Sequence, residues 1–292
     1  MAKLHRLRPV AVALLLSFLL SSCVATARVI KRGKRLVNGT TPALKNATLD
    51  ELSAIIARTF NAIQSFQATS VNLKLSKGSV YAGAVTDYTA FPGIVLFQKP
   101  DDIRIQAKVP LVGTLAFDMV SNGTNFSLVL QEKSLFVEGL NSTPPNSPNK
   151  IENLRPEAFL DSMLIRPVDA AKEQALLKDE TDTENALYRL ELLGKTKDGT
   201  ILPGRDVWFD RIDLTIVRQR IYDEKGLIIS DTSYSKWQPY SGVQFPAHID
   251  ISRPLDGYGV TIEVVKMDMN KELTRDQFVL QRPEGFTVKE IR

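Results

Sequence analysis

The feature that most limits the fold of this chain is a hydrophobic pattern with a period of two, which begins near Ser65 and recurs through most of the remaining sequence. In each such segment apolar and polar residues alternate, which gives a strand one dry face and one wet face. The segments are Val71–Leu75, Ile103–Val109, Leu115–Met119, Ile212–Ile216, His248–Ile251 and Val260–Val264. Turn signals at 122–123, 197–199, 224–226 and 255–257 separate them. The pattern predicts a long antiparallel meander.

Two segments show helical spacing instead. Thr48-Leu49-Asp50-Glu51 fits a capping box, and the apolar residues that follow it up to Ile63 recur every three or four positions. A second helix is predicted at Pro156–Leu164, after a proline-rich crossing loop at 141–150. Each helix has one apolar face to bury.

These elements predict one α+β domain over residues 48–292. We expect a strongly curved antiparallel sheet of roughly 10–11 strands, which is an incomplete β-barrel, with helices that cover its concave face.

The N-terminus has the organisation of an export signal. A basic segment precedes the apolar run Val10–Leu20, which is too short to span a bilayer comfortably. The run ends in Leu20-Ser21-Ser22-Cys23, which resembles a bacterial lipobox. That resemblance implies that residues 1–22 are a signal peptide and that Cys23 carries a diacylglyceryl group and a further acyl chain such as palmitate. The alternative is an ordinary secretory signal with a chance cysteine.

Residues 23–47 are predicted to be a lipidated flexible tether, because residues 24–47 lack hydrophobic periodicity. The first 48 residues hold nine Lys and Arg and no acid, out of 37 basic and 33 acidic residues in the chain. The remainder therefore has 28 basic and 33 acidic residues, a net charge of −5. The basic cluster at 28–35 suits anionic lipid headgroups, and no nucleic-acid partner is expected.

Three groups of short motifs stand out: Val109–Asp118 with Ser121–Gly123, Tyr222–Gly226 and Gly242–Pro246 within the run 214–251, and Phe278 near Pro283–Gly285. Together they resemble the LolA/LolB-like lipoprotein carriers, most closely LolB receptors of the outer membrane. The resemblance covers residues 50–288 in pattern. It implies an apolar half-barrel that holds lipid or the acyl chains of lipoproteins.

In LolB-like proteins an exposed apolar residue on a loop between strands helps to deliver cargo to the membrane. The matching position is Leu111, and Val112 shares the role. The alternative is that Leu111 packs under the sheet edge as ordinary core.

The dry face of the sheet supplies the candidate ligand cavity, because a large apolar surface is rarely left open. The candidates are Val71, Leu73, Ile103, Ile105, Phe117, Leu128, Leu214, Ile216, Ile249, Ile262 and Val264. The alternative is that these side chains form a filled core beneath the helices.

The sequence contains no strong catalytic motif. Once the signal is removed His248 is the sole histidine, and its place in an alternating strand favours a half-buried structural residue. Because Cys23 is the only cysteine, a thiol-ligated metal cluster is excluded. The sequence predicts no enzyme activity, cofactor or metal.

Val24 stands where aspartate favours inner-membrane retention in known lipoprotein sorting systems, so the periplasmic face of the outer membrane is the expected location. The chain is therefore predicted to be a lipid-anchored carrier of lipid or acylated lipoprotein. The alternative is a structural or assembly lipoprotein that docks a protein partner in the cell envelope.

Overall fold

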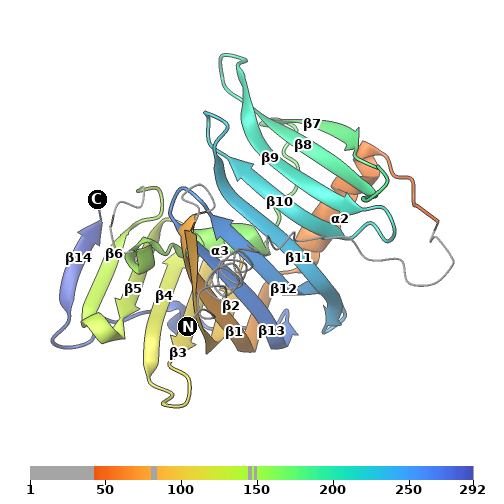
Figure 1. Ribbon diagram of the computed structural model, residues 1–292. Coiled ribbons are helices and arrows are strands. Elements are labelled where there is room, and N and C mark those ends of the chain that lie inside the picture. Colours follow the sequence, from red (N-terminus) through yellow and green to blue (C-terminus); the bar gives the residue numbers. More distant parts are fainter. Residues whose placement is uncertain (1–42, 80–83, 144–146, 148–149, 292) are drawn as a thin grey trace, which may run out of the picture. The chain divides into compact units, whose positions relative to one another are not determined.

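The computed structural model describes residues 43–79, 84–143, 147 and 150–291 (Figure 1). They belong to one compact unit, Pro42–Arg292. The predicted signal peptide and the lipidation site at Cys23 lie outside the described residues. Residues 43–47, at the end of the predicted tether, are attached to the domain, since the Lys45 amide donates to the Arg211 carbonyl oxygen (2.7 Å).

A single curved, unclosed sheet of 14 strands makes up most of the described chain (Figure 1). The strands of its first half are β1 (Ser65–Ser79), β2 (Ala84–Gln98), β3 (Asp102–Lys108), β4 (Leu115–Asn122), β5 (Asn125–Leu130) and β6 (Leu135–Leu140). The later strands are β7 (Glu173–Asp179), β8 (Leu187–Lys195), β9 (Ile201–Asp210), β10 (Ile216–Tyr222), β11 (Ile228–Tyr240), β12 (Val243–Arg253), β13 (Tyr258–Met269) and β14 (Thr287–Ile291).

The strand order is β14-β6-β5-β4-β3-β2-β1-β13-β12-β11-β10-β9-β8-β7. Neighbouring strands are antiparallel except β14 and β6, which run parallel. The predicted meander is therefore confirmed, but the predicted 10–11 strands are too few. The edge strand β7 was missed because its sequence, Glu-Gln-Ala-Leu-Leu-Lys-Asp, is poor in β-branched and aromatic residues.

The described residues contain two α-helices, α2 (Leu49–Ala62) and α3 (Pro156–Met163), and three 3₁₀ turns, η2 (Gln131–Lys133), η3 (Lys150–Asn153) and η4 (Arg275–Phe278). The capping box predicted for α2 is present, with Thr48 and Glu51 bonded reciprocally. Helix α3 contacts β3, β4, β11 and β12, and α2 contacts β7 and β12. The sequence predicted helices that cover the concave face, and these contacts do not show such a cover.

One predicted strand is wrong. Residues 211–214 form the turn between β9 and β10, which begins only at Ile216. Two aspartates explain the turn, because Asp210 accepts from the Ile212 amide (2.8 Å) and Asp213 accepts from the Thr215 amide (2.9 Å). Leu214 has a φ of 66° there and packs half-buried against the core, so the alternation at 212–216 is not a strand face.

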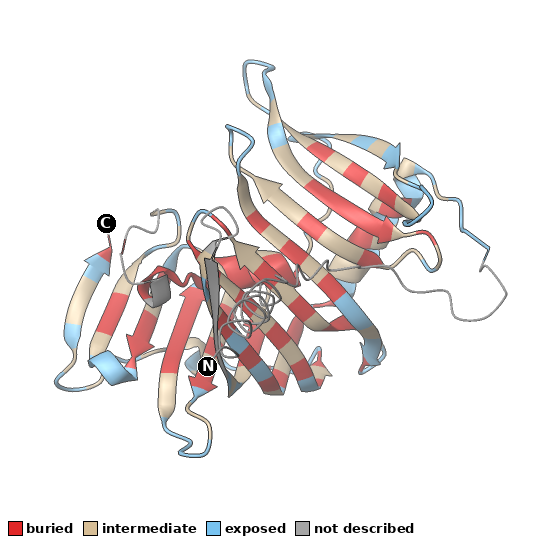
Figure 2. Ribbon diagram, viewed as in Figure 1, coloured by how far each residue is buried: buried red, intermediate tan, exposed pale blue. Residues whose placement is uncertain are grey.

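The buried side chains form rows that cross the sheet (Figure 2). One row pairs Leu73 of β1 with Ile262 of β13, and Ile262 with Ile249 of β12. Another row runs across β2 to β6 through residues that are all at most 1% exposed: Val95, Ile105, Met119, Leu128 and Val137. The inward-facing side chains of neighbouring strands therefore lie next to one another and form one continuous core.

An ionic cluster holds β14 at one edge of the sheet. Glu152 in η3 is 8% exposed and accepts from Lys289 Nζ of β14 (2.7 Å), Ser147 Oγ (2.8 Å) and Lys133 Nζ (3.1 Å). Burial alone would raise the pKa of Glu152, but these hydrogen bonds outweigh it and lower the pKa to about 2. The ionised carboxylate therefore stabilises the edge.

We predict that Glu152→Gln lowers the free energy of unfolding by about 2 kcal/mol at pH 7. Because the pKa of Glu152 is lower in the folded state, its contribution is complete above the ordinary value of 4.5 and is lost as the pH falls toward about 2. Urea unfolding at pH 7 and pH 3 checks this, with the exposed Glu132→Gln as the control. Equal destabilisation by the Glu152 variant at both pH values would contradict it.

Candidate functional site

Ten of the eleven predicted cavity residues are buried in the core, at 7% exposure or less, and Leu214 is half-buried. They pack against one another and against the helices as one cluster. Ile216 lines a small void of the described structure. The predicted residues therefore form a filled core in this conformation.

The void lies where α2, the end of α3 and the sheet meet, and we name this region the seam. Its lining is almost entirely apolar: Ile56, Thr59, Phe60, Ile63, Met163, Leu164, Ile165, Ile216, Tyr234, Trp237, Phe245 and Pro246. Its volume is about 20 Å³, which is little more than the space for one water molecule. Residues from both helices line it, so α2 and α3 lie on the same side of the sheet, its inner face.

Helix α2 is held by few anchors. Of its 14 residues only Leu52 and Ile56 are fully buried. Its C-terminal end is fixed by hydrogen bonds from Lys99 Nζ to the Phe60 oxygen (2.7 Å) and from Asn270 Nδ2 to the Ala62 oxygen (2.8 Å). Movement of this helix is the least costly way to enlarge the seam, because few buried contacts would break.

The loop between β3 and β4 presents apolar side chains to solvent. Leu111 is fully exposed and Val112 is 71% exposed. The loop is tight, since the Val109 amide donates to the Thr114 oxygen (2.8 Å) and the Gly113 amide to the Val109 oxygen (2.9 Å). Leu111 has a φ of 66°, a left-handed conformation that turns it away from the sheet. It is not a core residue, and its insertion into a membrane stays a prediction.

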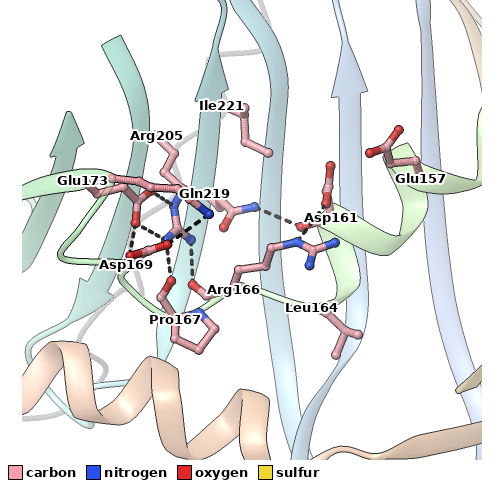
Figure 3. Close-up of a pocket in the computed structure, with 11 residues that line it drawn as sticks. Glu157, Asp161, Leu164, Arg166, Pro167, Asp169, Glu173, Arg205, Gln219 and Ile221 are labelled. Carbon is pink, nitrogen blue, oxygen red and sulfur yellow. Dashed lines mark hydrogen bonds and ion pairs between the residues drawn. The ribbon is translucent and has the colours of Figure 1, made fainter. Parts of the chain in front are cut away.

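A second, polar space lies beside α3, and we name it the cleft (Figure 3). Its volume is about 500 Å³, within the range of ligand pockets. Its walls come from α3, from the segment between α3 and β7, and from the strands β7, β9 and β10. The lining residues are Glu157, Asp161, Leu164, Arg166, Pro167, Asp169, Lys172, Glu173, Arg205, Gln219 and Ile221. Leu164 lines both the cleft and the seam.

One wall of the cleft is a closed ion pair. Arg205 donates to both carboxylate oxygens of Glu173 (2.8 and 2.9 Å), and its remaining donors reach the main-chain oxygens of Arg166 (2.7 Å) and Pro167 (3.0 Å). Every nitrogen of this guanidinium is thus occupied. Arg205 therefore fixes the shape of the cleft, and most of its donors are taken.

The opposite wall is acidic. Glu157 and Asp161 are one helical turn apart on α3, so both side chains lie on the same face. Burial and the neighbouring carboxylate raise the pKa of Glu157, and burial raises the pKa of Asp161 although Arg166 opposes it. Arg166 Nε lies 3.7 Å from Asp161, and its Nη2 bonds Asp101 (3.0 Å).

A strip of buried polar side chains continues from the cleft along the inner face under α3. It consists of Gln219, Ser230, Thr232 and Tyr234, each at most 4% exposed. Gln219 Nε2 donates to the main-chain oxygen of Asp161 (3.0 Å), and Thr232 Oγ1 donates to Ser162 Oγ (3.1 Å). Gln219 Oε1 and the Tyr234 hydroxyl have no hydrogen-bond partner.

No known family model matches this sequence, and neither does any curated protein. Solved structures do match. A DUF1329 family protein from Desulfovibrio piger has a TM-score of 0.52 and 18% identity, and the match covers 78% of this chain and 94% of that chain. A putative outer membrane lipoprotein-sorting protein domain from Vibrio parahaemolyticus has a TM-score of 0.50 and 12% identity, over 78% and 94%. A LolA superfamily protein from Nitrosomonas europaea is a weaker match, with a TM-score of 0.48 and 15% identity over 78% and 97%.

At these identities a likeness shows the fold alone. This chain shares its large curved sheet with the DUF1329 protein and with the lipoprotein-sorting domain. The predicted LolA-like fold is confirmed at that level, and LolB in particular is not distinguished.

His248 lies in β12, partly exposed, between Glu263 (3.3 Å) and Asp250 (3.4 Å). Within the described residues no group of three or more His, Cys, Asp or Glu is placed to hold a metal ion. Neither helix of the described part has the length and apolar composition that a bilayer crossing requires.

Sequence reasoning missed the cleft. Its charged residues come from α3, from a linker and from two separate strands, so no local pattern joins them. One signal was available, because Gln219 and Thr232 are polar residues at inward positions of adjacent strands.

We predict opposite effects for two acidic residues. Because the pKa of Glu157 is raised in the folded state, its ionisation destabilises the fold as the pH rises above the ordinary value, and Glu157→Gln should keep or raise the thermal midpoint at pH 7. Asp118 accepts from Arg104 (2.7 Å) and Gln106 (2.7 Å), so Asp118→Asn should cost about 2–4 kcal/mol. Calorimetry of both variants checks this; a lower midpoint for Glu157→Gln would refute it.

Proposed function

We propose that this protein is a lipid-anchored carrier of the bacterial cell envelope that binds lipid, or the acyl chains of lipoproteins, in the seam. The seam carries the proposal, because it is apolar, is bounded by a weakly anchored helix, and lies on the inner face of the sheet. The likeness in fold to a putative lipoprotein-sorting domain supports the same function.

The closed seam is too small for an acyl chain, since pockets for small ligands usually exceed about 300 Å³. Binding therefore requires displacement of α2, and the chain then replaces the contacts that Ile56, Phe60 and Ile63 make with the sheet. A carrier needs such a closable site, because an open apolar cavity would be hydrated or would bind unspecifically.

Attachment through Cys23 to the periplasmic face of the outer membrane completes this proposal, with the residues up to 42 as the connection to the domain. Two or three acyl chains hold a protein far more firmly on a bilayer than one. In this arrangement Leu111 and Val112 form the apolar tip that enters the membrane during transfer.

A second candidate is a lipoprotein that docks a protein partner. Its supporting observation is the filled core together with the exposed Leu111 and Val112. In that case the apolar tip is a contact surface, and the seam never opens.

The two tryptophans allow a direct test. Trp237 lines the seam. Trp208 instead lies under the guanidinium groups of Arg218 and Arg220. These two arginines flank the inward-facing Gln219 in β10, so they and Trp208 lie on the outer face of the sheet. We predict that a fatty acid with a brominated chain quenches more than half of the fluorescence of the full-length Trp208→Phe protein. The same protein with Trp237→Phe instead should be almost unaffected, because bromine quenches only on contact.

The unbrominated fatty acid is the control for indirect effects. Absence of quenching in both variants would refute the carrier function and favour the docking function. Lipid extraction and mass spectrometry of the protein purified from a bacterium would then identify the natural cargo class.

A further prediction concerns the tip. Leu111→Glu should slow transfer of a fluorescent lipid from the protein to vesicles at least tenfold, because a charged residue opposes entry into the bilayer. Since Leu111 is fully exposed, the thermal midpoint should be unchanged. Leu255→Glu, at an exposed residue in the turn between β12 and β13, is the matched control. Equal transfer rates for the two variants would exclude a role for the tip.

A further inference from the structure

We infer that the cleft binds the head group of the cargo lipid and selects a primary ammonium, as in phosphatidylethanolamine. This inference rests on the proposed carrier function and adds the chemical class of the ligand. The cleft and the seam would then be the two ends of one site for an amphiphile.

The first support is the set of charges that remain after internal pairing. Arg205 and Glu173 neutralise each other, and four of the five N–H donors of Arg205 are already bonded. Asp169 and Lys172 pair at 3.2 Å on the exposed rim. Glu157 makes no hydrogen bond or ion pair within the described residues, and Asp161 has only the 3.7 Å contact with Arg166. The charges of Arg166 and Arg253 act on both carboxyl groups without a direct bond to Glu157. The carboxylates of the inner cleft can therefore still accept hydrogen bonds from a positively charged donor.

The second support is independent of the acids. Gln219 is 3% exposed and lies in the wall of the cleft, yet its Oε1 accepts no hydrogen bond. A buried acceptor without a donor costs about 1–3 kcal/mol. A ligand ammonium has three N–H donors, which match the carboxylates of Glu157 and Asp161 and this amide oxygen. A trimethylammonium group has the same charge but no donor.

The third support is continuity between the polar and apolar spaces. Leu164, at the C-terminal end of α3, is the residue common to the cleft and the seam. Beneath α3 the polar strip leads from Gln219, opposite Thr232 across β10 and β11, to Tyr234 in the wall of the seam. A lipid whose ammonium lies at Glu157 and Asp161 would thus direct its chains past Leu164 into the seam.

The rim adds a place for the phosphate. Lys172 is 82% exposed, and its amine contacts only Asp169 among the described residues. Arg166 contacts Asp101 through Nη2 and Asp161 through Nε, so its Nη1 group takes part in neither contact. A head group with its phosphate near these two cations and its ammonium near the two acids is a zwitterion. Anionic head groups would meet the acids without a compensating charge.

Phospholipids with identical brominated chains test this inference through the fluorescence of Trp237. In the full-length Trp208→Phe protein we expect phosphatidylethanolamine to reach half-maximal quenching at a concentration at least fivefold lower than phosphatidylcholine or phosphatidylglycerol. The added pair Glu157→Gln and Asp161→Asn should abolish this preference. The control pair Glu132→Gln and Glu224→Gln changes the charge equally at exposed sites outside the cleft and should keep it.

The outcomes are distinguishable. Equal quenching by the three lipids, or a preference that survives in the cleft variant, would overturn the head-group inference while the carrier function stands. No quenching by any lipid would overturn both. If the double variant does not fold, Glu157→Gln alone serves, since Glu157 makes no direct hydrogen bond in the described residues and burial raises its pKa, and it should reduce the preference at least twofold.

Discussion

The pairing of β1 with β13 is the interaction on which the rest of the structure depends. It joins the strands of the first half of the chain to those of the second half, from Phe66 opposite Met269 to Lys77 opposite Tyr258. Closing a loop of this length has a high entropic cost. The cost is offset where the join is most apolar: Leu73 faces Ile262, and the Phe66 ring packs against the Phe97 and Phe245 rings at 5.2 and 5.7 Å. Without this join there would be two smaller sheets, and α3, which contacts β3 and β4 on one side and β11 and β12 on the other, would lose part of the surface on which it packs.

The inner face differs between the strands near this join and the strands farther from it. On both sides of it the inner face is apolar and filled, as in the row through Ile105, Leu128 and Val137. Farther along, on β10 and β11, that face becomes polar at Gln219 and Thr232. Helix α3 lies over this change, with hydroxyl contacts to the polar strip and apolar contacts to the core. An amphiphilic ligand is the kind of molecule that matches an inner face with this division.

Much of this fold could be predicted from the sequence, because alternation and helical spacing record burial directly. The capping box at Thr48 and the hairpin at Asn122-Gly123 were reliable for the same local reason. The predictions failed at two places, for one local and one non-local reason. At 212–216 the side chains of Asp210 and Asp213 stabilise a turn in spite of the alternation. The cleft was invisible because its acids and Gln219 meet only after α3 has docked on β11 and β12.

Opening of the seam can be argued from magnitudes. Leu52 and Ile56 are both 0% exposed, and each buried side chain of this kind contributes about 1.5–3 kcal/mol. Displacement of α2 therefore costs several kcal/mol, which keeps the empty seam closed. Each methylene of an acyl chain that enters contributes about 0.8 kcal/mol, so a chain of about a dozen offsets that cost. A ligand shifts an equilibrium only by its differential affinity for the two states. In the proposed carrier a head group in the cleft would bind both states alike, so the acyl chain would open the seam while the cleft would determine which lipid is bound.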